Sequence, residues 1–223
     1  MTRTSLKRRV LPSYTKGEEI FNMTTHIVGG GIGVITLVLC AVISCIKGSI
    51  VSLFSGIIFG TSMIALYTVS SIYHGLHTGM AKKVFQVLDH CTIYFLIAGT
   101  YTPMLLCSLV KVNPLAAYVT FAVVWGLTAL AVTLNAIDLK KYKVFSMVCY
   151  IGIGWSIIFS IADMYRALGT TGFFLLLGGG IVYTVGTLFY KIGSKKRYFH
   201  SVFHIFVLIG SIMHSLSVMI YAL

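Results

Sequence analysis

The sequence has 223 residues, of which 57% are hydrophobic and 10% are charged, and its formal net charge is +12. Soluble domains carry about 25% charged residues, so this composition excludes an ordinary soluble domain. It predicts an all-α integral membrane protein with a single polytopic domain. A charge of +12 also suggests a nucleic-acid partner, but that partner is disfavoured because the basic residues lie in short loops beside apolar segments, where membrane topology explains them.

Seven apolar stretches follow one another along the chain, each of roughly the 20 residues that a helix needs to cross a bilayer. They predict a seven-transmembrane helix bundle over residues 23–223, preceded by a short basic arm over residues 1–22. Within the first stretch, Gly29 and Gly33 have the spacing that indicates close packing between helices. The predicted spans are residues 23–46, 49–73, 84–109, 114–135, 144–165, 170–190 and 199–222.

The basic residues are distributed unequally between the two sides of this bundle. Seven spans place the N-terminal arm and the loops after spans two, four and six on one side, which holds 14 lysines and arginines, including Arg3 and Lys195. The other side holds three, namely Lys47, Lys111 and Arg166. Because cytoplasmic loops are enriched in basic residues, the N-terminus is predicted to be cytoplasmic and the C-terminus to lie outside.

Histidines lie at the ends of two spans that this topology sends to the inner leaflet. His200 and His204 begin the seventh span, and His74 ends the second. Histidines four residues apart share a helix face and can clamp a metal ion, and three histidines with a water form an open catalytic zinc arrangement. The alternative for His200 and His204 is a pair of histidines hydrogen-bonded within the bundle.

Two further polar residues are predicted at the same depth. Ser70 precedes His74 by four residues, and Asp89 lies near the start of the third span. Ionisable groups are costly inside a membrane, so their convergence points to a functional site. The alternatives are a serine that bonds its own helix backbone and an aspartate that pairs with Lys82 or Lys83.

The start of the first span adds Glu19, Asn22 and His26. Their spacing presents three polar groups on one face if the helix extends back to Glu19. The alternative is a segment that only leads into the membrane, with Glu19 favouring a helix N-terminus.

These four motifs, ExxNxxxH, SxxxH, an aspartate and a terminal HxxxH, resemble in that order the progestin and adipoQ receptor superfamily, and the chain's small size is similar to that of its bacterial haemolysin III branch. The resemblance implies that His74, His200 and His204 bind zinc, that Asp89 and Ser70 hold or contact its water, and that the chain lies in a bacterial plasma membrane. The short arm replaces the long N-terminal domain of the animal hormone receptors, which disfavours a hormone-receptor role.

The family is similar to alkaline ceramidases in this arrangement, which implies zinc-dependent hydrolysis of a lipid amide or ester and a role in membrane homeostasis. Membrane lipids are then the expected partners and a lipid the expected substrate. The alternatives are a non-catalytic homeostasis or sensing protein with structural zinc, a haemolytic or pore-forming protein, and a proton-coupled transporter. A pore should be lined through both leaflets, whereas the polar residues here gather at one end.

Overall fold

The computed structural model describes residues 4–193 and 196–223, so Arg3 and Lys195 lie outside the described residues. Within these ranges the regular structure is entirely helical. The long helices are α1 (Lys16–Ile46), α2 (Ile50–Gly75), α3 (Met80–Pro103), α4 (Pro114–Asp138), α5 (Lys143–Gly154), α6 (Ile161–Gly193) and α7 (Phe199–Ser217). Short 3-10 or π turns are η1 (Leu6–Arg8), η2 (Met104–Ser108), η3 (Leu109–Lys111), η4 (Ser156–Ser160) and η5 (Val218–Ala222).

Six helical stretches of the described residues are long and apolar enough to cross a membrane. Large apolar side chains such as Val34 and Leu115 are exposed, whereas Asn22 and Asn135 are fully buried, which is the reverse of a soluble protein. Helices also satisfy their own backbone hydrogen bonds, as a bilayer requires. The chain is therefore a multi-pass membrane protein. The stretches are Lys16–Ile46, Ile50–Gly75, Met80–Lys111, Pro114–Asp138, Lys143–Gly193 and Phe199–Ala222.

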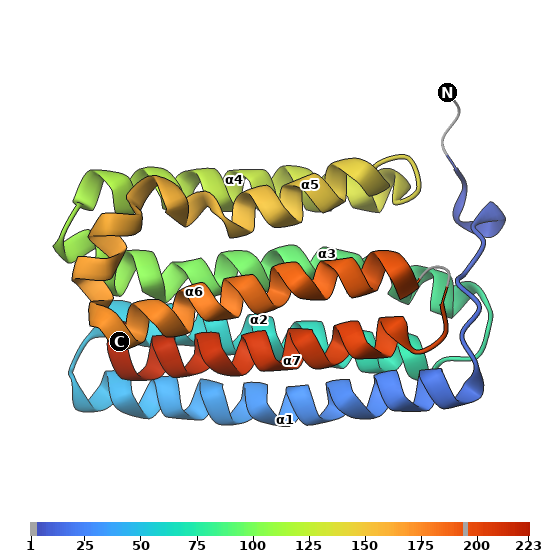
Figure 1. Ribbon diagram of the computed structural model, residues 1–223, viewed down its shortest axis with the longest axis horizontal. Coiled ribbons are helices and arrows are strands. Elements are labelled where there is room, and N and C mark those ends of the chain that lie inside the picture. Colours follow the sequence, from blue (N-terminus) through green and yellow to red (C-terminus); the bar gives the residue numbers. More distant parts are fainter. Residues whose placement is uncertain (1–3, 194–195) are drawn as a thin grey trace.

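The stretch Lys143–Gly193 covers two of the predicted spans, and its helix is interrupted. The 12 residues of α5 reach only about 18 Å, less than the thickness of the hydrocarbon core. Inside α6, Gly169 has φ 67° and ψ 177°, a backbone conformation that glycine adopts because it lacks a Cβ. The chain reverses in this region, since α5 lies beside α4 while the part of α6 after Gly169 runs beside α7 (Figure 1).

A capping box in the sequence determines where the first helix begins. The Thr15 hydroxyl accepts a hydrogen bond from the Glu18 backbone N–H at 3.3 Å, and Glu18 Oε2 accepts one from the Thr15 N–H at 2.8 Å. This capping box starts α1 at Lys16, seven residues before the start predicted from hydropathy. The helix therefore extends back beyond Glu19, so Glu19, Asn22 and His26 belong to one continuous helix, as the predicted polar face requires.

Close contact between α1 and α2 depends on glycine. A Cβ on Gly29 would overlap the ring of Tyr67, and one on Gly33 would lie 3.2–3.3 Å from Met63 and Ile64. The prediction of a close helix contact at these glycines is confirmed. The two helices thereby hold Glu19 and His74, one from each, at the same end of the bundle.

The two termini lie at opposite ends of the long axis of the bundle (Figure 1). The N-terminal arm shares its end with the C-terminal end of α2 and the start of α7. The third stretch, Met80–Lys111, is the most buried of the six, and α3 packs against α2 and α4. The arrangement brings residues from the beginning, the first third and the end of the chain together at one end of the molecule.

Candidate metal centre

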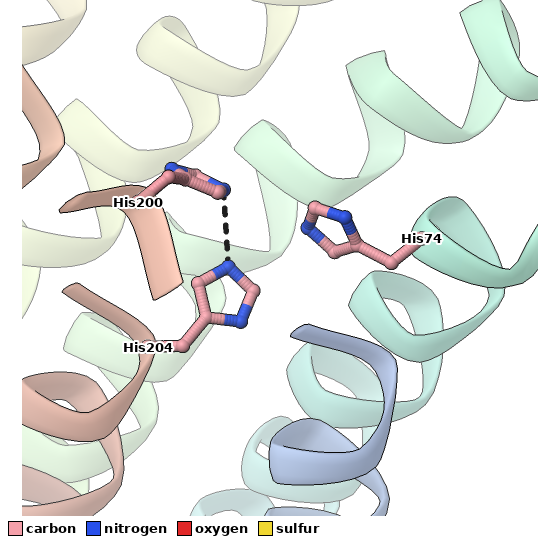
Figure 2. A group of neighbouring side chains, drawn as sticks. All are labelled: His74, His200 and His204. Carbon is pink, nitrogen blue, oxygen red and sulfur yellow. Dashed lines mark hydrogen bonds between the residues drawn. The ribbon is translucent and has the colours of Figure 1, made fainter. Parts of the chain in front are cut away.

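The first two turns of α7 carry His200 and His204, both buried. Their Nε2 atoms lie 3.1 Å apart and form a hydrogen bond (Figure 2), so the predicted alternative of a pair hydrogen-bonded within the bundle also fits them. Two nitrogens that bind one tetrahedral zinc ion are about 3.3 Å apart, so this pair has suitable spacing for a shared metal. The turn begins at Tyr198, whose left-handed backbone (φ 63°) is held by a 2.6 Å hydrogen bond from its N–H to Glu18 Oε1.

His74 comes from the last turn of α2 and completes a group of three buried histidines. One ring nitrogen from each of His74, His200 and His204 can be chosen so that all three lie within 4.8 Å of one another. Figure 2 shows the ring of His74 directed toward the α7 pair. Nε2 of His74 is buried without a hydrogen-bond partner. A buried orphan nitrogen facing two other imidazoles fits a metal ligand, so the group could hold a metal ion.

Glu19 fixes the other side of the His74 ring. His74 Nδ1 lies 2.6 Å from Glu19 Oε2, and Lys82 Nζ donates to Glu19 Oε1 at 2.7 Å. A carboxylate that accepts from Nδ1–H leaves Nε2 deprotonated and available for a metal, as in carboxylate–histidine–zinc groups. Glu19 is thus the carboxylate behind the histidine, a position that sequence reasoning left unassigned.

The predicted alternative for Asp89, a pair with Lys82 or Lys83, is wrong. Lys82 binds Glu19 and the Leu76 carbonyl, and Lys83 donates to the Lys7 carbonyl at 2.7 Å. Among the described residues, no basic side chain forms an ion pair with Asp89. Its carboxylate instead borders a cavity.

That cavity has a volume of about 670 Å³ and opens on the histidine group. Its walls include Ser70, Asp89, His200 and His204, so it brings together four of the five residues predicted for the metal and its water. His74 is not among the residues that line it. The remaining lining is mostly aromatic and aliphatic, including Ile93, Leu96, Phe173, Leu176 and Leu177.

The rest of the first motif lies against the same histidines. The His26 ring stacks on His204 with centroids 3.8 Å apart and planes inclined by 30°. The side chains of His26 and Asn22 are both buried without hydrogen-bond partners. The segment therefore does more than lead into the membrane, because His26 packs on the histidine group. The other part of that alternative holds, since Glu19 lies in the first turn of α1.

Tyr14 is a neighbour of the centre that sequence reasoning missed. Its ring stacks on His200, with centroids 4.9 Å apart and an interplanar angle of 17°. Burial raises the pKa of the Tyr14 phenol well above its usual range, so this ring stays neutral. Tyr14 falls in the basic arm, and the arm's charge gave no signal of a contact with the site.

The other histidines lie apart from the group. His77 is exposed. His90 Nδ1–H donates to the Gln86 carbonyl at 2.8 Å, and its Nε2 lies 3.2 Å from the Tyr190 hydroxyl. His214 Nε2 bonds the Leu176 carbonyl at 3.0 Å. The four-residue spacing of the terminal pair and the predicted topology identified the three clustered histidines correctly as neighbours.

Comparison with known proteins identifies the family of the chain. Residues 14–215 match the haemolysin-III related family. The chain belongs to this family. It is 36% identical to Hemolysin-3 of Bacillus cereus over 92% of each chain, and 36% identical to a Hemolysin-3 homolog of Bacillus subtilis over 89% of this chain and 91% of the relative. It is 28% identical to the human monocyte to macrophage differentiation factor over 70% of this chain and 66% of that protein.

We expect Glu19→Gln to weaken metal binding by roughly 10- to 100-fold, the usual effect of losing a carboxylate behind a ligating histidine. Glutamine keeps the shape of the side chain but loses the charge that faces His74 and Lys82. Competition with a fluorescent zinc chelator measures the affinity of the purified protein. Asp163→Asn is the matched control, because Asp163 pairs with Arg166 at 3.4 Å and Asn113 at 2.8 Å in another part of the bundle. Equal affinities of the Glu19→Gln and wild-type proteins would contradict this role.

Proposed function

We propose that this haemolysin-III related protein is a zinc-dependent hydrolase of lipid amides or esters that acts in membrane homeostasis. The observation that carries the proposal is a buried three-histidine group beside a large apolar cavity that also contains Asp89 and Ser70. Three protein ligands leave a fourth tetrahedral position open, which is typical of catalytic rather than structural zinc sites. The cavity offers room for an acyl chain next to that position.

His74, His200 and His204 would hold the ion. When bound there, zinc would supply a Lewis acid and would lower the pKa of water to about 7. Asp89 accepts a proton from the attacking water and returns it to the leaving nitrogen or oxygen as the acyl bond breaks. Ser70 donates a hydrogen bond to the carbonyl oxygen, where negative charge develops. The products are a fatty acid and an amine or an alcohol.

The test is release of fatty acid from ceramides, acyl-amides and phospholipids in bilayers that contain the purified full-length protein. We expect release from at least one of these classes, loss of release after zinc chelation, and recovery when zinc is restored. A zinc-loaded protein that hydrolyses none of them would contradict the proposal and favour a non-catalytic protein, in which zinc only links α2 to α7. The lipids of the membrane are the partners in either case.

The names of the two Bacillus relatives raise haemolysis as a second activity. A water-filled pore needs polar lining through both leaflets. Here the three clustered histidines come from the last turn of α2 and the start of α7, at one end of the bundle, and most of the residues that line the cavity are aliphatic or aromatic. These features favour the hydrolase over the pore.

We also propose seven crossings of a bacterial plasma membrane, with the N-terminus in the cytoplasm and the C-terminus outside. Three features support this topology: the 14 to 3 bias of basic residues, the termini at opposite ends of the bundle, and the reversal at Gly169 inside the stretch Lys143–Gly193. An even number of crossings would leave both termini on the same side.

Reporter fusions test this topology. A fusion after Lys141 should report the cytoplasm, and fusions after Arg166 and at the C-terminus should report the outside. The fusion at Arg166 is the decisive one, because it separates seven crossings from six. A cytoplasmic reporter at that position would contradict the division of the stretch Lys143–Gly193 into two spans.

A further inference from the structure

The N-terminal arm forms part of the cavity wall. Residues 8–14 line the cavity, and two contacts hold the arm in place. The Thr4 N–H donates to Asp138 Oδ2 at 2.7 Å, which attaches the arm to the end of α4. Lys83 Nζ donates to the Lys7 carbonyl at 2.7 Å, which attaches it to the start of α3. The arm is therefore part of the folded bundle and sits over the end of the cavity.

Arg9 is the unusual residue of this arm. The residue lines the cavity although it is only 7% exposed, and its Nε and Nη1 atoms are buried without hydrogen-bond partners. The nearby carboxylate of Asp138 is already occupied by the backbone N–H groups of Thr4, Lys140 and Lys141. Burial lowers the pKa of Arg9 and Asp138 opposes this effect, but a guanidinium stays charged in proteins. A buried charge with unused donors calls for an anion.

The rest of the cavity indicates what kind of anion fits. Arg8, Lys140 and Lys143 also line it, whereas Asp89 is the one carboxylate among its described lining residues. Beyond this basic rim the walls are mainly aliphatic and aromatic. The charge and the apolar depth together match an amphiphile with one anionic head and an acyl chain.

We propose that Arg9 binds the phosphate of an anionic phospholipid whose acyl chain extends into the cavity toward the histidine group. The guanidinium fork suits two oxygens of one phosphate. This inference rests on the proposed function only in naming the class of lipid that the hydrolase would take. Arg9 lies before the residues 14–215 that match the family model.

The experiment uses the purified full-length protein in phosphatidylcholine nanodiscs that contain increasing amounts of phosphatidylglycerol with a photoreactive acyl chain. We expect one phosphatidylglycerol per chain, crosslinked to cavity residues such as Phe173 or Leu176. Arg9→Gln should lower its affinity roughly 10- to 100-fold, the range for losing a charged hydrogen bond. Lys7→Gln is the matched control, because it removes one charge from an exposed position of the same arm. Circular dichroism and zinc content establish that each variant is folded.

Equal binding by the Arg9→Gln and wild-type proteins would overturn the proposal, as would an equal loss in Lys7→Gln, which would indicate diffuse attraction to the arm. Displacement by oleate but not by unlabelled phosphatidylglycerol would assign the anion to a fatty-acid carboxylate and overturn the phosphate assignment. Inorganic phosphate alone should compete weakly, because it lacks an acyl chain. Strong competition by phosphate would overturn the proposal that the ligand is an amphiphile.

Failure of the hydrolase can be told apart from failure of this site. The His200→Ala/His204→Ala protein should still bind phosphatidylglycerol, since its basic rim is intact. Binding that depends on Arg9 in a protein without hydrolytic activity would reject the hydrolase and retain the lipid site. Hydrolysis by a protein whose phosphatidylglycerol binding does not depend on Arg9 would reject the lipid site and retain the hydrolase.

Discussion

The His200→Ala/His204→Ala protein is expected to lose its zinc almost completely, from about one ion per chain in the wild type. The two substitutions remove two of three imidazoles whose nitrogens face a common point, and a single remaining histidine binds zinc weakly. Metal analysis after purification in the presence of zinc measures the occupancy.

His214→Ala is the control on the same helix, because His214 bonds the Leu176 carbonyl and lies outside the group of three. His77→Ala is the exposed control, three residues after His74. Both should retain zinc. Since alanine leaves space beside the stacked His26 ring, a His200→Gln/His204→Gln protein provides a better-packed version of the same test. Full zinc retention in both double variants would refute the assignment of these ligands.

Asp89→Asn is expected to keep the fold and the zinc but to lower lipid hydrolysis by roughly 10²- to 10⁴-fold, the usual contribution of a general base. Asparagine is nearly isosteric with aspartate but cannot accept the proton of the attacking water. No ion pair is lost, because Asp89 has none among the described residues. Rates of fatty-acid release under saturating lipid, with zinc content measured in parallel, give the comparison.

Asp163→Asn serves as the matched control for this substitution, since it also neutralises one carboxylate. Undiminished hydrolysis by a fully zinc-loaded Asp89→Asn protein would reject the role of Asp89. A large loss of stability without a specific loss of rate would instead indicate that the carboxylate is structural.

Much of the fold is predictable from hydropathy, because a helix in lipid needs a long apolar run whatever its neighbours are. The limits of α5 and the turn at Gly169 are not predictable in this way. They depend on where α5 packs against α4 and on a backbone conformation that glycine permits but does not require. Hydropathy also missed the start of α1, since a capping box acts through individual hydrogen bonds.

For the site, topology alone brought the ends of α2 and α7 to one depth, so the histidines could be predicted as neighbours. The contacts of Glu19 with His74 and Lys82 could not, because three side-chain conformations must agree across α1, α2 and α3. The positions of Tyr14 and Arg9 in the N-terminal arm could not be predicted for another reason. Basic residues before a first span are explained by topology, and this explanation gives no cause to place them inside a cavity.

The bond between Glu18 and the Tyr198 N–H joins the first helix to the last. Glu18 is synthesised early in translation and Tyr198 late. A chain that stops before α7 has only one of the three clustered histidines. The three-histidine group therefore forms only when α7 has packed against the rest of the bundle. A metal ion held by all three histidines would then mark a chain whose last span is in place.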